Sequence, residues 1–232
     1  MTDTPTRHPS DLSGLVVIFD LDGTLVDSAP DLAGAMNAVL RAEGLRPLAP
    51  AVVRPLVGDG ARALLRRGYA ENGRAFPDGA AGDALVGAFL EHYAAHLADE
   101  TRAFPGAEDA LDALAAAGAA LAVCTNKPER LTHPLLDRLG LAARFEIVLG
   151  RDSLARCKPD PLPLLTIRAR TGRARGVMVG DTATDRDAAR AADMAFLHAR
   201  FGYGPADLPL SNAEQRFEGF EALFDRIAEV AA

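Results

Sequence analysis

Near its N-terminus the chain reads Val16-Val17-Ile18-Phe19-Asp20-Leu21-Asp22-Gly23-Thr24-Leu25-Val26-Asp27-Ser28, an apolar run that ends abruptly in carboxylates. The run from 15 to 19 is short, mostly β-branched and without polar alternation, which is typical of a strand buried on both faces of a parallel sheet. Asp20 and Asp22 would then lie at the carboxyl end of the strand, where open α/β sheets bind ligands. Because two like charges this close repel each other, we expect a cation or a shifted pKa beside them. A plain Asp-Gly turn would explain Asp22 but would leave Asp20 without a role.

The composition limits the classes of protein and partner. With 232 residues, the chain can form one large domain with an insertion or two small domains, and 49% hydrophobic residues can build a sizeable core. The net charge of -7 argues against nucleic acid and anionic membranes as partners. Residues 1–14 are mostly polar, and the apolar run after them is too short for a signal peptide or a membrane span. We therefore expect a cytoplasmic protein with a frayed N-terminus, as a monomer or homodimer.

Helical and strand patterns divide the chain into two parts. From residue 29 to about 100 the sequence predicts three helices, at 29–42, after the 56–60 segment as far as about 69, and at 83–97, with no convincing strand. Ser28 is the expected N-cap of the first helix. From residue 104 the pattern alternates: strands are expected at 120–124, 145–149, 176–179 and 195–198, with helices between them and a last helix at 217–230.

Strand-helix alternation predicts a parallel sheet. We therefore expect an α/β protein with a Rossmann-like parallel sheet core. Residues 1–28 and 101–232 would form this core, and residues 29–100 would form an all-helical cap domain inserted after the first strand.

Three later segments place polar side chains at the end of a predicted strand or the start of a predicted helix. They are Thr125-Asn126-Lys127, Lys158-Pro159, and Asp181 with Asp185 one helical turn later. Of the 25 lysine and arginine residues, only Lys127 and Lys158 are lysines. In so arginine-rich a chain, a lysine indicates a place where a compact ammonium group is required.

Four segments together resemble the four motifs of the haloacid dehalogenase superfamily, specifically its phosphatases. They are Asp20-Leu21-Asp22-Gly23-Thr24, Thr125-Asn126-Lys127, Lys158-Pro159, and Gly180-Asp181 with Asp185. The resemblance covers nearly the whole chain, including a helical cap after the first motif. It implies hydrolysis of a phosphate ester of a small metabolite, with Mg²⁺ as the cofactor.

The resemblance also assigns roles to these residues. Asp20 would be the nucleophile that forms an aspartyl-phosphate, and Asp22 the general acid and base. Thr125, Asn126 and Lys158 would bind the phosphoryl group. Asp20, Asp22 through its carbonyl, and Asp181 would bind Mg²⁺, with Asp185 in support. Asp185 alone is also explained as a first-turn aspartate that the helix dipole favours.

Within the superfamily the chain is most similar to bacterial phosphoglycolate phosphatases. Dehalogenases lack the second aspartate, and phosphonate-cleaving members use a cap lysine, which residues 29–100 do not contain. Similarity to phosphoglycolate phosphatases is carried by Thr125-Asn126-Lys127-Pro128, Val57-Gly58-Asp59-Gly60 and Phe201-Gly202-Tyr203-Gly204. The expected reaction converts 2-phosphoglycolate to glycolate and phosphate. The alternatives are a phosphatase of sugar-acid phosphates such as N-acetylmuramate 6-phosphate, a sugar phosphomutase, and a non-enzymatic regulator, which the complete motif set disfavours.

A small carboxylated substrate requires a cation, and the cap offers candidates. Gly58 and Arg62 are the cap residues expected to contact the substrate, with Arg54 also flanking the 58–60 loop. The competing interpretation is that both arginines are ordinary surface residues. The role of Tyr203 is equally open, since a Gly-Tyr-Gly loop can be mobile.

Overall fold

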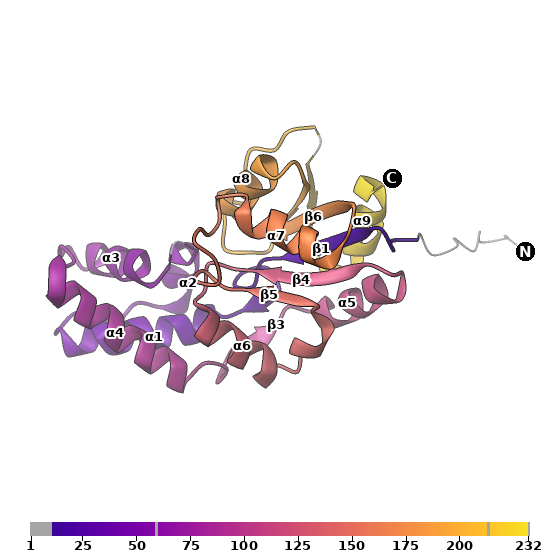
Figure 1. The fold of residues 1–232 in the computed structure, drawn as a ribbon. Helices are drawn as coiled ribbons and strands as arrows, with labels where there is room; N and C mark the ends of the chain where they lie inside the picture. The colour runs from indigo at the N-terminus through magenta and orange to yellow at the C-terminus, as the bar shows by residue number, and fades with distance from the viewer. Residues whose placement is uncertain (1–10, 59, 213, 232) are drawn as a thin grey trace, which may run out of the picture.

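The computed structural model describes residues 11–58, 60–212 and 214–231, and its centre is a six-stranded parallel sheet (Figure 1). The strands lie in the order β5-β4-β1-β6-β7-β8, and every neighbouring pair is parallel. Their bounds are β1 Leu15–Phe19, β4 Ala120–Cys124, β5 Ile147–Leu149, β6 Arg175–Gly180, β7 Ala195–Ala199 and β8 Gln215–Phe217. The predicted α/β class and parallel sheet are confirmed.

The central strand β1 is buried on both faces. Val16 and Ile18 belong to one core cluster and Val17 and Phe19 to the other, because successive side chains of a strand point to opposite faces. The first cluster includes side chains of α7 and α8, and the second includes side chains of α5, α6 and α9. These helices are α5 Ala107–Ala116, α6 Glu129–Arg138, α7 Leu162–Thr171, α8 Ala183–Ala191 and α9 Leu223–Ala231. Full burial of each large apolar side chain contributes roughly 1.5–3 kcal/mol, so β1 anchors both layers.

Between β1 and β4 the chain forms a helical segment, residues 29–95, which lies to one side of the sheet (Figure 1). Its elements are α1 Ala29–Ala42, α2 Pro50–Val53, the 3-10 turn η1 Arg54–Leu56, α3 Ala61–Glu71 and α4 Gly79–Ala95. α1 packs against the other three α-helices.

Two short connections join the helical segment to the sheet. β2 Val26–Asp27 pairs antiparallel with β3 Arg102–Ala103, where the chain leaves and re-enters the sheet-bearing part. The buried carboxylate of Asp31 accepts hydrogen bonds from the Thr101 backbone N–H at 2.9 Å and from Thr101 Oγ1 at 2.7 Å. The start of α1 is therefore fixed to the returning connection.

The structure corrects several predicted boundaries. Ser28 makes no capping hydrogen bond to α1, because its hydroxyl donates to Asp22 Oδ1 at 2.5 Å instead. The helix expected from residue 83 begins at Gly79. The last helix, expected at 217–230, begins only at Leu223 as α9, and Gln215–Phe217 form the edge strand β8, which was not predicted. The short elements α2, β2 and β3 were not predicted. The division into a core and a cap at residues 29 and 100 stays a prediction, and residues 1–10 and Asp59 lie outside the described residues.

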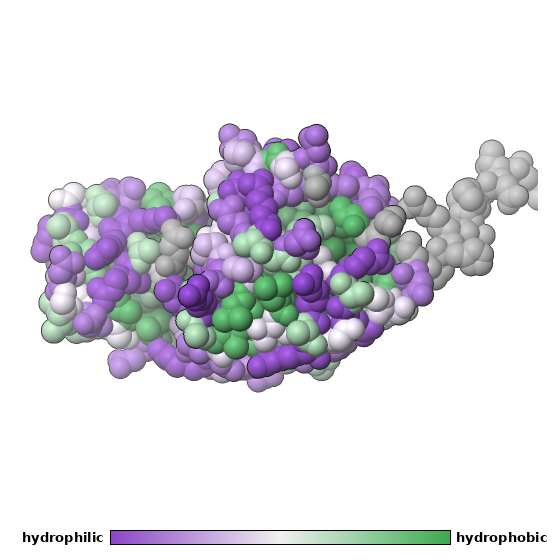
Figure 2. All heavy atoms as spheres, turned by 45° about the horizontal axis from the view of Figure 1, so that its top comes forward, coloured by the Kyte–Doolittle hydropathy of each residue, from purple (hydrophilic) through white to green (hydrophobic). Residues whose placement is uncertain are grey.

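Hydrophilic residues cover much of the face in Figure 2, and hydrophobic residues gather mainly near its middle. Among the described residues, the exposed large hydrophobic side chains are Val52 and Leu162, at 39% and 37%. Within the described chain, no helix has both the length and the apolar character that a membrane span requires.

Candidate active site

The carboxyl ends of three adjacent strands bring the predicted site residues together. β1 lies between β4 and β6. Asp20 follows β1, Thr125 follows β4, and Asp181 follows β6. Ligands of open parallel sheets bind outside these strand ends, so the topology explains why distant segments form one site.

Lys158 connects two carboxylates of this site. Its Nζ lies 2.9 Å from Asp20 Oδ1 and 2.6 Å from Asp185 Oδ1, and its side chain is 2% exposed. Burial raises the pKa of Asp20 to about 6, although the charge of Lys158 opposes this rise. Burial would lower the pKa of Lys158, but the charges of Asp185 and Asp20 outweigh it and raise the pKa. Lys158 therefore remains a cation at neutral pH.

Asp181 is completely buried, and its carboxylate accepts three hydrogen bonds. Thr24 Oγ1 donates at 3.0 Å to one oxygen. The backbone N–H groups of Tyr203 and Gly204 donate to the other oxygen at 2.7 and 3.1 Å. These donors hold the carboxylate in one orientation.

The loop that supplies these donors needs its glycines. A Cβ atom at Gly202 would lie 2.3 Å from Asp181 Cβ, and one at Gly204 would lie 1.9 Å from the Asp181 carbonyl oxygen. Both distances are well inside van der Waals contact, so only glycine allows the loop to approach so closely.

Asp20, Asp181 and Asp185 form an acidic cluster whose possible ligand atoms all lie within 4.8 Å of one another. Burial, followed by the negative charges of Asp185 and Asp20, raises the pKa of Asp181 to about 7. Lys158 is the cation paired with the cluster among the described residues. Hard divalent cations such as Mg²⁺ prefer carboxylate oxygens, so the donor set fits such an ion.

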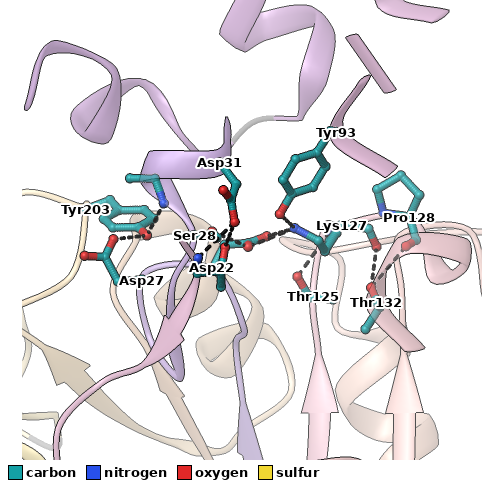
Figure 3. A network of polar contacts seen from close by, with 12 residues as sticks. Asp22, Asp27, Ser28, Asp31, Tyr93, Thr125, Lys127, Pro128, Thr132 and Tyr203 are labelled. Carbon is teal, nitrogen blue, oxygen red and sulfur yellow. Dashed lines mark hydrogen bonds and ion pairs between the residues drawn. The ribbon is translucent and has the colours of Figure 1, made fainter. Parts of the chain in front are cut away.

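Asp22 belongs to a second network beside this cluster (Figure 3). Its carboxylate accepts a hydrogen bond from Ser28 Oγ and lies 2.9 and 3.1 Å from Lys127 Nζ. Lys127 Nζ also donates to the Tyr93 hydroxyl on α4 at 2.6 Å. The Asp22 side chain is thus directed away from the acidic cluster.

A cavity that is partly open to solvent lies between the strand ends and the helical segment. Its polar lining includes Asp20, Asp22, Thr125, Asn126 and Lys127. The helical segment contributes mainly apolar side chains and glycines: Leu32, Val57, Gly58, Gly60, Ala61, Leu64, Phe89 and Leu90, together with Tyr93. The cavity can therefore hold a polar group against the sheet and a further group against the helices.

A haloacid dehalogenase-like hydrolase model matches residues 17–199, which include all the polar strand-end residues described above. The chain belongs to the haloacid dehalogenase-like hydrolase family. This conclusion confirms the resemblance found in the sequence.

Proteins similar to this hydrolase include phosphoglycolate phosphatases. A phosphoglycolate phosphatase of Caulobacter vibrioides is 46% identical over 195 residues, covering 83% of this chain and 82% of the relative. One of Chromobacterium violaceum is 42% identical over 211 residues, covering 90% and 94%. A crystal structure of a predicted phosphoglycolate phosphatase from Haemophilus somnus 129PT superposes with a TM-score of 0.82 at 28% identity, covering 95% of this chain and 99% of the other.

The hydrolase brings most of its predicted site residues to the cavity or the cluster. Asp20, Asp22, Thr125, Asn126 and Gly58 line the cavity. Asp181 and Asp185 form the acidic cluster together with Asp20, and Lys158 is paired with that cluster. The Asn126 amide donates to the Lys158 carbonyl at 3.0 Å, so it connects the loops after β4 and β5. The roles of these residues stay predictions.

Arg62 is the predicted site residue that the structure brings to neither the cavity lining nor the acidic cluster. Its guanidinium pairs with Asp83 and lies 5.8 Å from the centre of the Phe76 ring. Arg54 likewise pairs with Asp27 and lies 5.3 Å from the centre of the Tyr203 ring. In this structure, Arg54 and Arg62 are both paired with carboxylates outside the cavity lining.

Sequence reasoning assigned no site role to Lys127 or Tyr93 and left the role of Tyr203 open. Tyr203 is 6% exposed, accepts a hydrogen bond from the Ala29 N–H at 2.9 Å and donates to Asp27 Oδ1 at 2.8 Å. It therefore connects the Asp181 loop to the start of α1. The rarity of lysine was a usable signal for Lys127, whereas nothing in the sequence distinguished Tyr93 from an ordinary core aromatic.

Proposed function

We propose that this hydrolase is a Mg²⁺-dependent phosphomonoesterase that converts 2-phosphoglycolate to glycolate and phosphate. The observation that carries the proposal is the arrangement of Asp20: a carboxylate at a strand end, facing a cavity, with Lys158 Nζ 2.9 Å away. The names of the relatives support the same substrate. An anionic phosphate can approach an anionic nucleophile only where positive charge surrounds both.

In the first half of the reaction, an Asp20 carboxylate oxygen attacks phosphorus. The new bond joins Asp20 to phosphorus, and the bond from phosphorus to the glycolate oxygen breaks. Asp22 donates a proton to that leaving oxygen. In the second half, Asp22 removes a proton from the water that attacks phosphorus, and phosphate leaves Asp20.

The remaining groups bind and orient the phosphoryl group. Asp20, the Asp22 carbonyl and Asp181 would hold Mg²⁺, which supplies positive charge that neutralises the phosphoryl oxygens. Thr125 and Asn126 line the cavity beside Asp20, and Lys158 provides a fixed ammonium. Residues 29–100 would act as a cap that excludes water during the reaction.

The apolar lining of the cavity favours a second candidate. α3 and α4 give the cavity walls of apolar side chains, which a two-carbon acid offers little surface to contact. A phosphatase of a larger sugar-acid phosphate, of the N-acetylmuramate 6-phosphate kind, would use the same chemistry with a larger leaving group.

Phosphate release from a panel of esters tests the proposal. The panel contains 2-phosphoglycolate, N-acetylmuramate 6-phosphate and glucose 1-phosphate, each with Mg²⁺ and each with wild type and Asp20→Asn. Selective release from 2-phosphoglycolate that disappears in the variant supports it. Preference for the sugar acid supports the second candidate, and a sugar isomer without free phosphate would contradict both.

A further inference from the structure

The cavity contains a buried cation that the reaction above does not use. Lys127 lines the cavity, and its side chain is 3% exposed. Burial would lower its pKa, but the charge of Asp22 and the contact with Tyr93 outweigh burial and raise it. The ion pair with Asp22 offsets the cost of burying this ammonium.

Among the described residues that line the cavity, Lys127 supplies the positive charge. Lys158 lies outside that lining, between Asp20 and Asp185. Arg62 and Arg54 are paired with Asp83 and Asp27. A carboxylate that enters with the leaving group would otherwise meet Asp22 and apolar walls, where an unpaired charge is strongly disfavoured.

Tyr93 completes the site as a hydrogen-bond donor. Its hydroxyl accepts a hydrogen bond from Lys127 Nζ, and no acceptor for the hydroxyl proton is found among the described residues. Tyr93 lines the same cavity from α4. An ammonium and a free O–H, 2.6 Å apart, present a carboxylate with a charge partner and a second donor.

The position of the pair also fits the geometry of the reaction. Asp22 must reach the oxygen that leaves phosphorus, and Lys127 Nζ lies 2.9 Å from Asp22 Oδ1. In a 2-phospho acid, the carboxylate is separated from that same oxygen by a single carbon atom. A group bonded so close to the leaving oxygen falls within reach of Nζ when Asp22 contacts that oxygen.

We infer that Lys127 and Tyr93 form the receptor for the substrate carboxylate and thereby select phosphate esters of 2-hydroxy acids. This inference rests on the proposed function and adds the residues that set its specificity. It replaces Arg62 with Lys127 as the specificity cation. Because Tyr93 lies on α4, binding of the carboxylate also joins the helical segment to the loop after β4.

The test compares two substrates that differ only in the carboxylate. These are 2-phosphoglycolate and 2-hydroxyethyl phosphate, in which a neutral CH₂OH group replaces the carboxylate. The variants are Lys127→Met, Tyr93→Phe and, as the matched control that removes a positive charge outside the cavity, Arg62→Met. The readout is the ratio of kcat/KM for the acid to kcat/KM for the alcohol, with KM and kcat determined separately.

We expect Lys127→Met to lower this ratio at least about tenfold, mainly through a higher KM for the acid. Tyr93→Phe keeps the ring and Lys127, so it lowers the ratio several-fold and keeps the test valid if Lys127→Met does not fold. Arg62→Met leaves the ratio unchanged. If both Lys127→Met and Tyr93→Phe slow the two substrates equally, the pair only positions Asp22 and the inference is overturned.

The activity of the wild type distinguishes failure of the receptor from failure of the proposed function. If wild type does not hydrolyse 2-phosphoglycolate, both the proposed substrate and the proposed receptor are refuted before any variant is measured. If wild type hydrolyses it and Arg62→Met alone lowers the ratio, the proposed function stands and the receptor is wrong.

Discussion

Replacement of Gly204 by alanine tests how the Asp181 carboxylate is held. A Cβ at this position would lie 1.9 Å from the Asp181 carbonyl oxygen, a backbone atom that cannot rotate away. The loop must therefore shift, and the N–H groups of Tyr203 and Gly204 leave Asp181. A hydrogen bond to a charged group contributes about 1.5–3 kcal/mol. Allowing for partial relaxation, we expect the free energy of unfolding to fall by about 2–4 kcal/mol.

Urea denaturation measures this loss, and thermal shift on Mg²⁺ titration measures the weaker metal binding that should accompany it. The matched control is Gly34→Ala on the exposed face of α1, where a new Cβ meets nothing within 4 Å. This control should stabilise the protein by about 0.5–1 kcal/mol, because alanine favours the helix. If Gly204→Ala unfolds within about 0.5 kcal/mol of wild type and binds Mg²⁺ equally well, the loop does not hold Asp181 as described.

Further predictions concern the other buried groups. Without a divalent cation, burial raises the pKa values of Asp20 and Asp181 from 3.8 to about 6 and about 7. Between pH 3.8 and these raised values, the folded state therefore binds more protons than the unfolded state. The stability of the metal-free protein should therefore fall as the pH rises from about 4 to 7. Thermal stabilisation by Mg²⁺ should grow over the same range, because the ion binds the ionised carboxylates. A rise in Tm on Mg²⁺ addition that does not depend on pH would contradict the raised pKa values. Tyr203→Phe should lower the free energy of unfolding by about 1–3 kcal/mol in urea, because it leaves the Ala29 N–H and the Asp27 carboxylate without their partner; no change would show that this contact is not stabilising. Asp22→Asn should lower kcat/KM for 2-phosphoglycolate by about 10²–10⁴-fold and lower kcat/KM for p-nitrophenyl phosphate much less, because nitrophenolate leaves without a proton. kcat/KM reports the transfer to Asp20 and not the later hydrolysis, in which Asp22 acts as base for both substrates; equal losses of kcat/KM would remove Asp22 as the general acid.

The parts of the fold that the sequence predicted are those whose signal is local. β1 was predicted within its observed bounds because a continuous apolar run of buried residues can be recognised without knowledge of its neighbours. β2 and β3 have two residues each, which is too short for any periodicity, and β8 is a three-residue edge strand that depends on pairing with β7. Ser28 has a capping residue type, but the nearby Asp22 carboxylate takes its hydroxyl.

In the candidate site too, residues with a local signal were predicted and contacts between distant segments were not. Asp20, Lys158 and Asp181 were found because each follows a strand or precedes a helix in a characteristic pattern. The contact between Lys127 and Tyr93 joins α4 to the loop after β4 and depends on how the helical segment packs on the sheet. Arg62 carries the charge expected of a substrate contact, yet Asp83, which no short-range pattern connects to it, pairs with its guanidinium.

Covalent phosphorylation of Asp20 is the central claim, and a rapid-quench experiment tests it most directly. Wild type is mixed with excess 2-phosphoglycolate and Mg²⁺, quenched in acid within one turnover, digested and analysed by mass spectrometry. We predict one phosphoryl group on the peptide that contains Asp20, formed before free phosphate accumulates and absent in Asp20→Asn. Steady release of phosphate with no modified peptide, and continued hydrolysis by Asp20→Asn, would contradict the mechanism.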